Sequence, residues 1–159
     1  MPDRRRPGGA VLFDLDGTFA DTAPDMAHAL NLLLGQQGRA PLPFETIRPH
    51  VSHGAKAMVR IGFGLEPDNN GFDALRRQFL DLYAANLVRE TAPFPGMLEL
   101  ADELEERGIP WGIVTNKPAW LTDPLIETLG LGGRAACIVS GDTAASGQQD
   151  AKMAAVISA

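Results

Sequence analysis

Cysteine is almost absent from this 159-residue chain, in which Cys137 is the only one. A single cysteine excludes an intrachain disulfide and a zinc site built from several cysteines. Histidine is also scarce, and His28, His50 and His53 do not follow the spacing of a metal-binding motif. Because Cys137 lies in the apolar run AACIV, we expect it to be a small buried core residue.

Long apolar runs and an excess of positive charge are missing as well. No stretch approaches the roughly 20 consecutive apolar residues of a membrane-spanning helix. The apolar stretch that follows MPDRRRPGGA is too short for the core of a signal peptide. The net charge of −6 disfavours general binding to nucleic acids or anionic membranes. We therefore expect a cytoplasmic protein with no nucleic-acid partner and no membrane partner.

The composition suffices for a folded core, and the pattern of predicted helices and strands changes along the chain. A composition of 45% hydrophobic and 21% charged residues is typical of a globular domain. The predicted strands cover residues 10–14, 110–115 and 135–141, and the predicted helices cover residues 24–34, 44–62, 71–88, 97–108 and 119–130. The helix over 44–62 is expected to break around SHG, and TAPFPGM marks a boundary.

This order of elements predicts an α/β fold with an insertion. Strands that alternate with helices indicate a parallel sheet, here formed by residues 9–21 and 93–159. Residues 22–92 are predicted to be an all-helical domain inserted after the first strand. In such sheets, ligands bind at the carboxyl ends of the strands. Asp14, Thr115 and Asp142 all follow predicted strands closely.

The most informative stretch is AVLFDLDGTFADT, residues 10–22. Val11, Leu12 and Phe13 are expected to form a buried strand, and Asp14 and Asp16 follow at its end. Two converging carboxylates are costly unless a cation neutralises them or one is protonated. Oxygen-rich sites of this kind suit Mg²⁺. An acidic turn that caps the next helix would also explain the spacing, and these residues alone leave both interpretations open.

The combination of two motifs is more specific. FDLDGTFADT resembles the first signature of the haloacid dehalogenase-like hydrolases, and IVTNKP at residues 113–118 resembles their second. The resemblance covers roughly residues 9–143. SHGAKAMV, PFPGM and WGIVTNKP are most similar to the phosphoglycolate phosphatase branch, and more closely to its N-acetylmuramic acid 6-phosphate phosphatase members. The resemblance implies a Rossmann-like core with an α-helical cap.

The resemblance also implies an activity and the residues that carry it. The family hydrolyses small phosphomonoesters, here 2-phosphoglycolate or a sugar phosphate such as N-acetylmuramic acid 6-phosphate. Asp14 would be the nucleophile that forms an aspartyl-phosphate, and Asp16 the general acid and base. Mg²⁺ would be held by Asp14 and Asp16. Thr115 and Asn116 would bind the phosphate.

Further substrate contacts are less sharply defined. Lys117 is expected either to reach the substrate phosphate or to be solvated. Ser52, His53 and Gly54 lie in the helical insertion, which in this branch closes over the site and recognises the leaving group. These three residues could equally form an ordinary turn between helices. The expected partner is a small phosphorylated metabolite, and the expected state is a monomer or a weak homodimer.

The end of the sequence departs from the family pattern. A lysine that neutralises the phosphate is expected near Gln148 or Gln149, whereas Lys152 lies several residues later. A fourth strand, with the acidic pair that completes the Mg²⁺ site, is not found. We therefore expect a C-terminally truncated chain with impaired activity, in which the first strand lies at a sheet edge. The alternatives are a catalytically inactive remnant that serves as a phosphate-binding or interaction module, and a phosphoglucomutase-like phosphotransferase.

Overall fold

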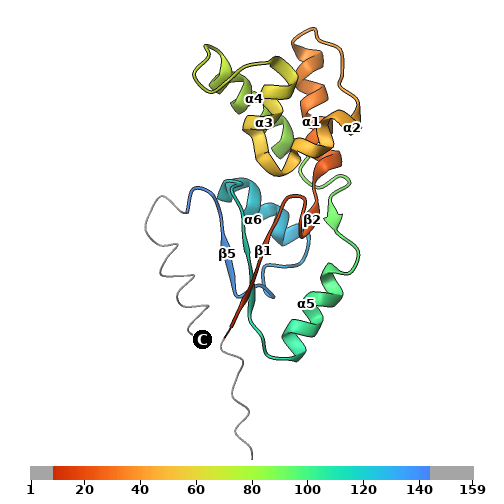
Figure 1. Cartoon of the computed structure of the whole chain (residues 1–159), viewed down its shortest axis with the longest axis vertical. Helices are drawn as coiled ribbons and strands as arrows, with labels where there is room; N and C mark the ends of the chain where they lie inside the picture. The colour runs from red at the N-terminus through yellow and green to blue at the C-terminus, as the bar shows by residue number, and fades with distance from the viewer. Residues whose placement is uncertain (1–8, 144–159) are drawn as a thin grey trace, which may run out of the picture. The chain divides into compact units, whose positions relative to one another are not determined.

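The computed structural model describes residues 9–143, which divide into two compact units (Figure 1). The first unit comprises residues 9–19 and 93–143, and the second comprises residues 20–92. Each is described below by itself.

The first unit is built on a parallel sheet with the strand order β1-β4-β5 (Figure 1). Its elements are β1 (Val11–Asp14), α5 (Met97–Glu106), β4 (Trp111–Val114), α6 (Ala119–Thr128) and β5 (Cys137–Val139). Both strand pairs are parallel, so all three strands end at the same edge of the sheet. The predicted parallel α/β sheet is thereby confirmed, and so is the burial of Cys137.

Burial along the sheet separates its middle strand from β1. Residues 111–113 of β4, which lies between the other two strands, are all buried. In β1, by contrast, Val11 and Phe13 are half-buried and Leu12 is 36% exposed. The expectation of a fully buried first strand is therefore wrong. The reason is that β1 pairs only with β4 among the described residues and lies at the edge of this sheet.

An aromatic cluster anchors the chain on both sides of the loop that follows β1. The rings of Phe19 and Trp111 stack with centroids 5.6 Å apart, and Phe13 meets Phe19 edge-on at 5.5 Å. Phe19 and Trp111 are buried. Such ring pairs add stabilisation beyond the area that they bury. They therefore fix the start and the end of the loop that carries Asp14 and Asp16.

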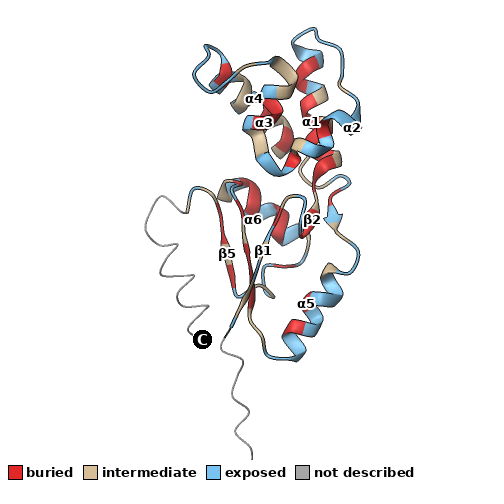
Figure 2. Ribbon diagram, viewed as in Figure 1, coloured by how far each residue is buried: buried red, intermediate tan, exposed pale blue. Residues whose placement is uncertain are grey.

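The second unit is entirely helical between its terminal strands. Its elements are β2 (Ala20–Asp21), α1 (Ala23–Gln36), α2 (Phe44–Ile47), the 3₁₀ helix η1 (Arg48–His53), α3 (Gly54–Phe63), α4 (Phe72–Ala85) and β3 (Ala92–Pro93), whose last residue belongs to the first unit. Helix α4 packs on α1 and α3, and Figure 2 shows the buried sides of these helices in red. The predicted break at SHG is confirmed, because η1 ends at His53 and α3 begins at Gly54, where φ is +72°.

The chain passes between the two units twice, at β2 and at β3. These strands pair in a two-stranded sheet of their own. Beside them, the Phe94 amide donates a hydrogen bond to the Phe19 carbonyl oxygen over 2.9 Å. Neither strand was predicted, since two residues are too few for an alternating pattern. Within residues 9–143, no helix is both long enough and apolar enough to cross a membrane.

Gly112 is required by the close packing of the middle strand. It pairs with Leu12 on β1 and with Cys137 on β5. A Cβ atom at this position would lie 2.5 Å from the Cys137 Sγ and 2.8 Å from the Cys137 carbonyl oxygen. The Cys137 carbonyl oxygen cannot move without displacing a paired strand, so the added methyl group overpacks the sheet.

We expect Gly112→Ala to lower the free energy of unfolding by about 1–3 kcal/mol. Urea denaturation followed by tryptophan fluorescence measures this change, because both tryptophans, Trp111 and Trp120, belong to the first unit. Gly133→Ala is the matched control, since a Cβ there meets nothing within 4 Å. Equal midpoints for the two variants would show that the strands yield to the extra methyl group.

Candidate active site

The loop after β1 presents two carboxylates at the carboxyl end of the sheet. Asp14 is the last residue of β1 and is exposed, Leu15 is completely buried, and Asp16 is half-buried. The Phe19 amide donates to the carbonyl oxygens of Asp14 and Leu15, over 3.2 Å and 3.1 Å. Gly17 has a φ of +77°, which only glycine adopts readily, and so allows the chain to turn this tightly.

The environment of Asp14 opposes its negative charge. Partial desolvation of the carboxyl group raises the pKa of Asp14 above its ordinary value of 3.8, although the residue as a whole is exposed, and the neighbouring Asp16 charge raises this pKa further. A hydrogen bond of 2.7 Å from the Leu15 amide to Asp14 Oδ1 lowers the same pKa in part. A cation beside Asp14 would therefore stabilise the ionised carboxylate.

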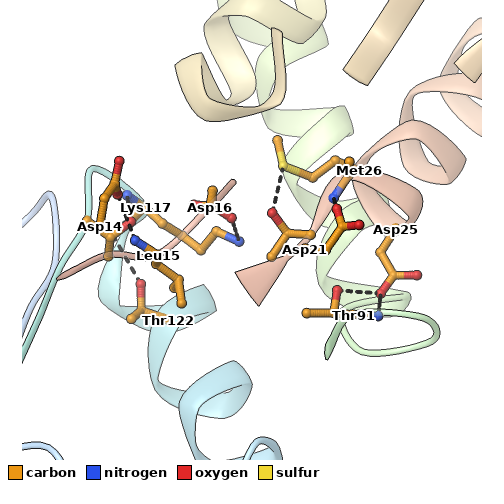
Figure 3. A network of polar contacts seen from close by, with 12 residues as sticks. Asp14, Leu15, Asp16, Asp21, Asp25, Met26, Thr91, Lys117 and Thr122 are labelled. Carbon is orange, nitrogen blue, oxygen red and sulfur yellow. Dashed lines mark hydrogen bonds and ion pairs between the residues drawn. The ribbon is translucent and has the colours of Figure 1, made fainter. Parts of the chain in front are cut away.

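Lys117 forms an ion pair with Asp16, as Figure 3 shows. The Lys117 Nζ atom lies 2.8 Å from Asp16 Oδ1, and the two side chains are only 5% and 13% exposed. The alternative that Lys117 is simply solvated is therefore wrong, whereas its contact with a substrate phosphate stays a prediction. The register explains the pairing, because Asp14 on β1 stands opposite Val114 on β4 and both chains continue past the same sheet edge.

Thr115 lies at the end of β4 with a buried side chain. Its amide donates to the Val139 carbonyl oxygen over 2.8 Å, which ties the loop to β5. Its Oγ1 accepts a hydrogen bond of 3.1 Å from the Lys117 amide. The Thr115 hydroxyl can therefore donate its own hydrogen to an anion. The next residue, Asn116, is exposed.

Three of the predicted substrate residues belong to the helical unit. Ser52 and His53 are exposed at the end of η1, and Gly54 is the first residue of α3. Their contact with a substrate stays a prediction. Gln148, Gln149 and Lys152, which the sequence analysis considered for the missing lysine, lie outside the described residues.

Asp21, the third aspartate of the first motif, has a structural role. Its Oδ1 accepts a hydrogen bond of 3.3 Å from the Ala23 amide at the start of α1. Its Oδ2 lies 3.2 Å from a guanidinium nitrogen of Arg48. Asp21 therefore stabilises the entry into the helical unit, where a negative charge near the start of a helix is favourable.

The donor set at the end of β1 fits a divalent cation of the Mg²⁺ type. Carboxylate and carbonyl oxygens of Asp14 and Asp16 are hard ligands, and Mg²⁺ commonly takes one or two carboxylates, water and substrate phosphate. The raised pKa of Asp14 means that its surroundings disfavour the ionised carboxylate, and such a cation would offset this cost. Among the residues that the structure describes, no three or more His, Cys, Asp and Glu side chains gather into a metal site.

Comparison with known proteins identifies the family. The family model described as haloacid dehalogenase-like hydrolase matches residues 11–153. The chain therefore belongs to the haloacid dehalogenase-like hydrolase family, a class that agrees with the parallel sheet and the DLDGT and TNK motifs at its edge.

Curated relatives carry phosphatase names. The chain is 38% identical over 141 residues to an N-acetylmuramic acid 6-phosphate phosphatase of Pseudomonas putida, covering 89% of this chain and 63% of the relative. It is 36% identical over 156 residues to a phosphoglycolate phosphatase of Caulobacter vibrioides, covering 96% and 66%. The chain thus spans less than two thirds of the length of these relatives.

Solved structures confirm the fold. The crystal structure of a predicted phosphoglycolate phosphatase from Haemophilus somnus has a TM-score of 0.76 at 21% identity, covering 92% of this chain and 72% of that one. A haloacid dehalogenase-like family hydrolase from Streptococcus pneumoniae has a TM-score of 0.75 at 20% identity, covering 91% and 71%. At such identities the likeness is one of fold, and it confirms the predicted Rossmann-like core.

Proposed function

We propose that this protein is a Mg²⁺-dependent phosphatase of small phosphomonoesters that works through an aspartyl-phosphate. The observation that carries the proposal is the meeting of Asp14, Asp16, Thr115 and Lys117 where β1 and β4 end. A phosphomonoester substrate is supported by two relatives, 36% and 38% identical to this chain, which are named as phosphatases.

Asp14 is the nucleophile in this proposal. One of its carboxylate oxygens attacks phosphorus, and the bond between phosphorus and the leaving oxygen breaks. Asp16, protonated at its second carboxyl oxygen when the ester binds, gives this proton to the leaving oxygen, which departs as an alcohol. The ionised Asp16 then takes a proton from water, whose oxygen attacks phosphorus and releases Asp14 and inorganic phosphate.

The remaining residues hold the phosphate and Asp16 in place. The Thr115 hydroxyl donates to a phosphate oxygen, and the Asn116 backbone amide lies next to it in sequence. Lys117 is ion-paired with Asp16 and fixes the direction of that carboxylate. Mg²⁺ bound by Asp14 and Asp16 would supply positive charge that offsets the repulsion between the carboxylate and the phosphate.

The leaving group is proposed to be glycolate or an amino sugar such as N-acetylmuramic acid. Ser52 and His53 offer exposed polar groups in the helical unit, and we propose that they contact it. Both substrates present a carboxylate, which can accept hydrogen bonds from a serine hydroxyl and from an imidazole N–H.

Phosphate release from a substrate panel tests the function. The 159-residue chain is incubated with 2-phosphoglycolate, N-acetylmuramic acid 6-phosphate and β-glucose 1-phosphate, with Mg²⁺ or with EDTA. We expect inorganic phosphate from one of the first two substrates, and only with the metal. No release above the EDTA background from either one would overturn the proposal. Conversion of β-glucose 1-phosphate to glucose 6-phosphate without phosphate release would instead favour a phosphotransferase.

A further inference from the structure

The turn after β5, residues 140–143, contacts the loop that carries Lys117 at three points. The Gly141 amide donates to the Lys117 carbonyl oxygen over 2.9 Å. The Ala119 amide donates to Asp142 Oδ1, also over 2.9 Å. Gly141 itself lies against the Asn116 backbone so closely that a Cβ atom would be 2.2 Å from the Asn116 carbonyl oxygen.

The turn is well enough fixed to act as a support. The Thr143 amide donates to the Ser140 carbonyl oxygen over 3.0 Å, and the Ser140 amide donates to Thr143 Oγ1 over 3.2 Å. Ser140 is only 2% exposed. The turn therefore extends β5 as a closed hydrogen-bonded unit that presents Gly141 and Asp142 to the neighbouring loop.

Helix α6 holds the same loop from its other side. The Thr122 hydroxyl lies 3.2 Å from the Lys117 carbonyl oxygen and 3.1 Å from the Pro118 carbonyl oxygen, both of which can accept from it (Figure 3). The Lys117 carbonyl thus has donors from the β5 turn and from α6. The backbone from which the lysine side chain extends is fixed on two sides.

We propose that Asp142 is a positioning residue for Asp16, acting through Lys117. Asp142 and Gly141 hold the backbone of residues 117–119, and this backbone places the Lys117 ammonium 2.8 Å from Asp16 Oδ1. Because the lysine side chain is a flexible four-carbon stem, the position of its backbone decides which atoms the ammonium can reach, and a displaced backbone would move the ammonium out of its preferred contact with Asp16 Oδ1. The proposal rests on the proposed function, in which Asp16 transfers the proton.

The first test observes the lysine directly and needs no activity. In the ¹⁵N-labelled chain, whose lysines are Lys56, Lys117 and Lys152, the Lys117 ammonium cross-peak is assigned by its loss in Lys117→Met. We expect this peak in the unaltered chain, because the ammonium is buried and ion-paired. Asp142→Ala should broaden or abolish it. Asp142→Asn should retain it, since its amide oxygen can still accept from Ala119.

Two further variants separate positioning from simple loss of stability. Thr128→Gly removes the hydrogen bond from the Thr128 hydroxyl to the Pro124 carbonyl oxygen and weakens the far end of α6. It should keep the Lys117 peak. Asp142→Glu keeps the charge but moves the acceptor by one methylene, so it should lose the peak even if Asp142→Ala does not fold.

Kinetics give the second test. Asp142→Ala should lower kcat about 10–100-fold with little change in KM, the size of effect that a displaced supporting residue has. Asp142→Asn should restore most of kcat. An unchanged Lys117 peak in both Asp142→Ala and Asp142→Glu, or an equal loss in Thr128→Gly, would overturn the proposal. If the unaltered chain releases no phosphate, the proposed function fails and the spectra alone decide the positioning role.

Discussion

Asp14→Asn is expected to lower the rate of phosphate release by ~10³-fold or more, the scale on which loss of a nucleophile acts. The amide that replaces the carboxylate is neutral and cannot form an acyl-phosphate at a useful rate. Its Oδ1 can still accept from the Leu15 amide, so the loop should keep its shape. The measurement is phosphate release with Mg²⁺ from the best substrate of the panel.

The same substitution is expected to raise the thermal midpoint of the metal-free chain at pH 7. Burial raises the pKa of Asp14, so the folded state binds this proton more tightly than the unfolded state does. Ionisation of Asp14 above its ordinary pKa of 3.8 therefore disfavours folding, and the asparagine removes that penalty. The gain should shrink as the pH falls below about 4, where Asp14 is protonated in both states.

Asp21→Asn is the matched control for Asp14→Asn. Asp21 belongs to the same motif, but its carboxylate binds the Ala23 amide and Arg48. Its substitution should leave most of the activity and should not raise the midpoint. If Asp14→Asn and Asp21→Asn retain similar activity in the presence of Mg²⁺, Asp14 is not the nucleophile.

Asp25→Ala is expected to unfold the helical unit at much lower urea concentration, with a loss of about 3–5 kcal/mol in free energy. The Asp25 carboxylate is 1% exposed and accepts hydrogen bonds from three successive amides, those of residues 89–91, at 3.0–3.1 Å; Figure 3 shows its contact with Thr91. The Thr91 hydroxyl donates to it as well, over 2.7 Å. Truncation leaves these donors without their acceptor, and each lost bond to a charged group is costly.

A single tyrosine makes this loss measurable in the helical unit itself. Tyr83 is buried on α4 and stacks on Phe79, so fluorotyrosine at this position reports unfolding of residues 20–92 by ¹⁹F NMR. Asp81→Ala, an exposed aspartate of α4, is the control and should change stability by less than about 0.5 kcal/mol. Equal midpoints for Asp25→Ala and Asp81→Ala would show that the buried carboxylate contributes nothing.

The sequence predicted the elements of the fold well because its patterns are local. Glycine and proline punctuation together with the apolar spacing located each long helix, for example 24–34 against the observed Ala23–Gln36. The expected strand at 110–115 is observed at Trp111–Val114. The site residues Asp14 and Thr115 follow from strand ends, since parallel strands bring their carboxyl ends to one edge.

The contacts that fix the site were not predictable because they join residues far apart in the sequence. The ion pair of Lys117 with Asp16 depends on the exact register of β1 and β4. Asp25 is one acidic position within the predicted helix over residues 24–34, and no local pattern indicates its contact with three amides more than 60 residues later. Leu12 was expected to be buried but is 36% exposed. The reason is that the burial of a strand depends on its place in the sheet, and β1 lies at the edge of this one.

The paired strands β2 and β3 close the helical unit at its base. Seen from the α/β sheet, the chain between Phe19 and Phe94 leaves and returns at neighbouring points, joined there by a 2.9 Å hydrogen bond. The entropy of closing such a loop grows only slowly with its length. Helices in residues 22–91 could therefore be lengthened, shortened or exchanged for another module. The chain would still leave the sheet after Phe19 and return to it at Phe94. The helical unit is therefore a replaceable attachment on the α/β sheet.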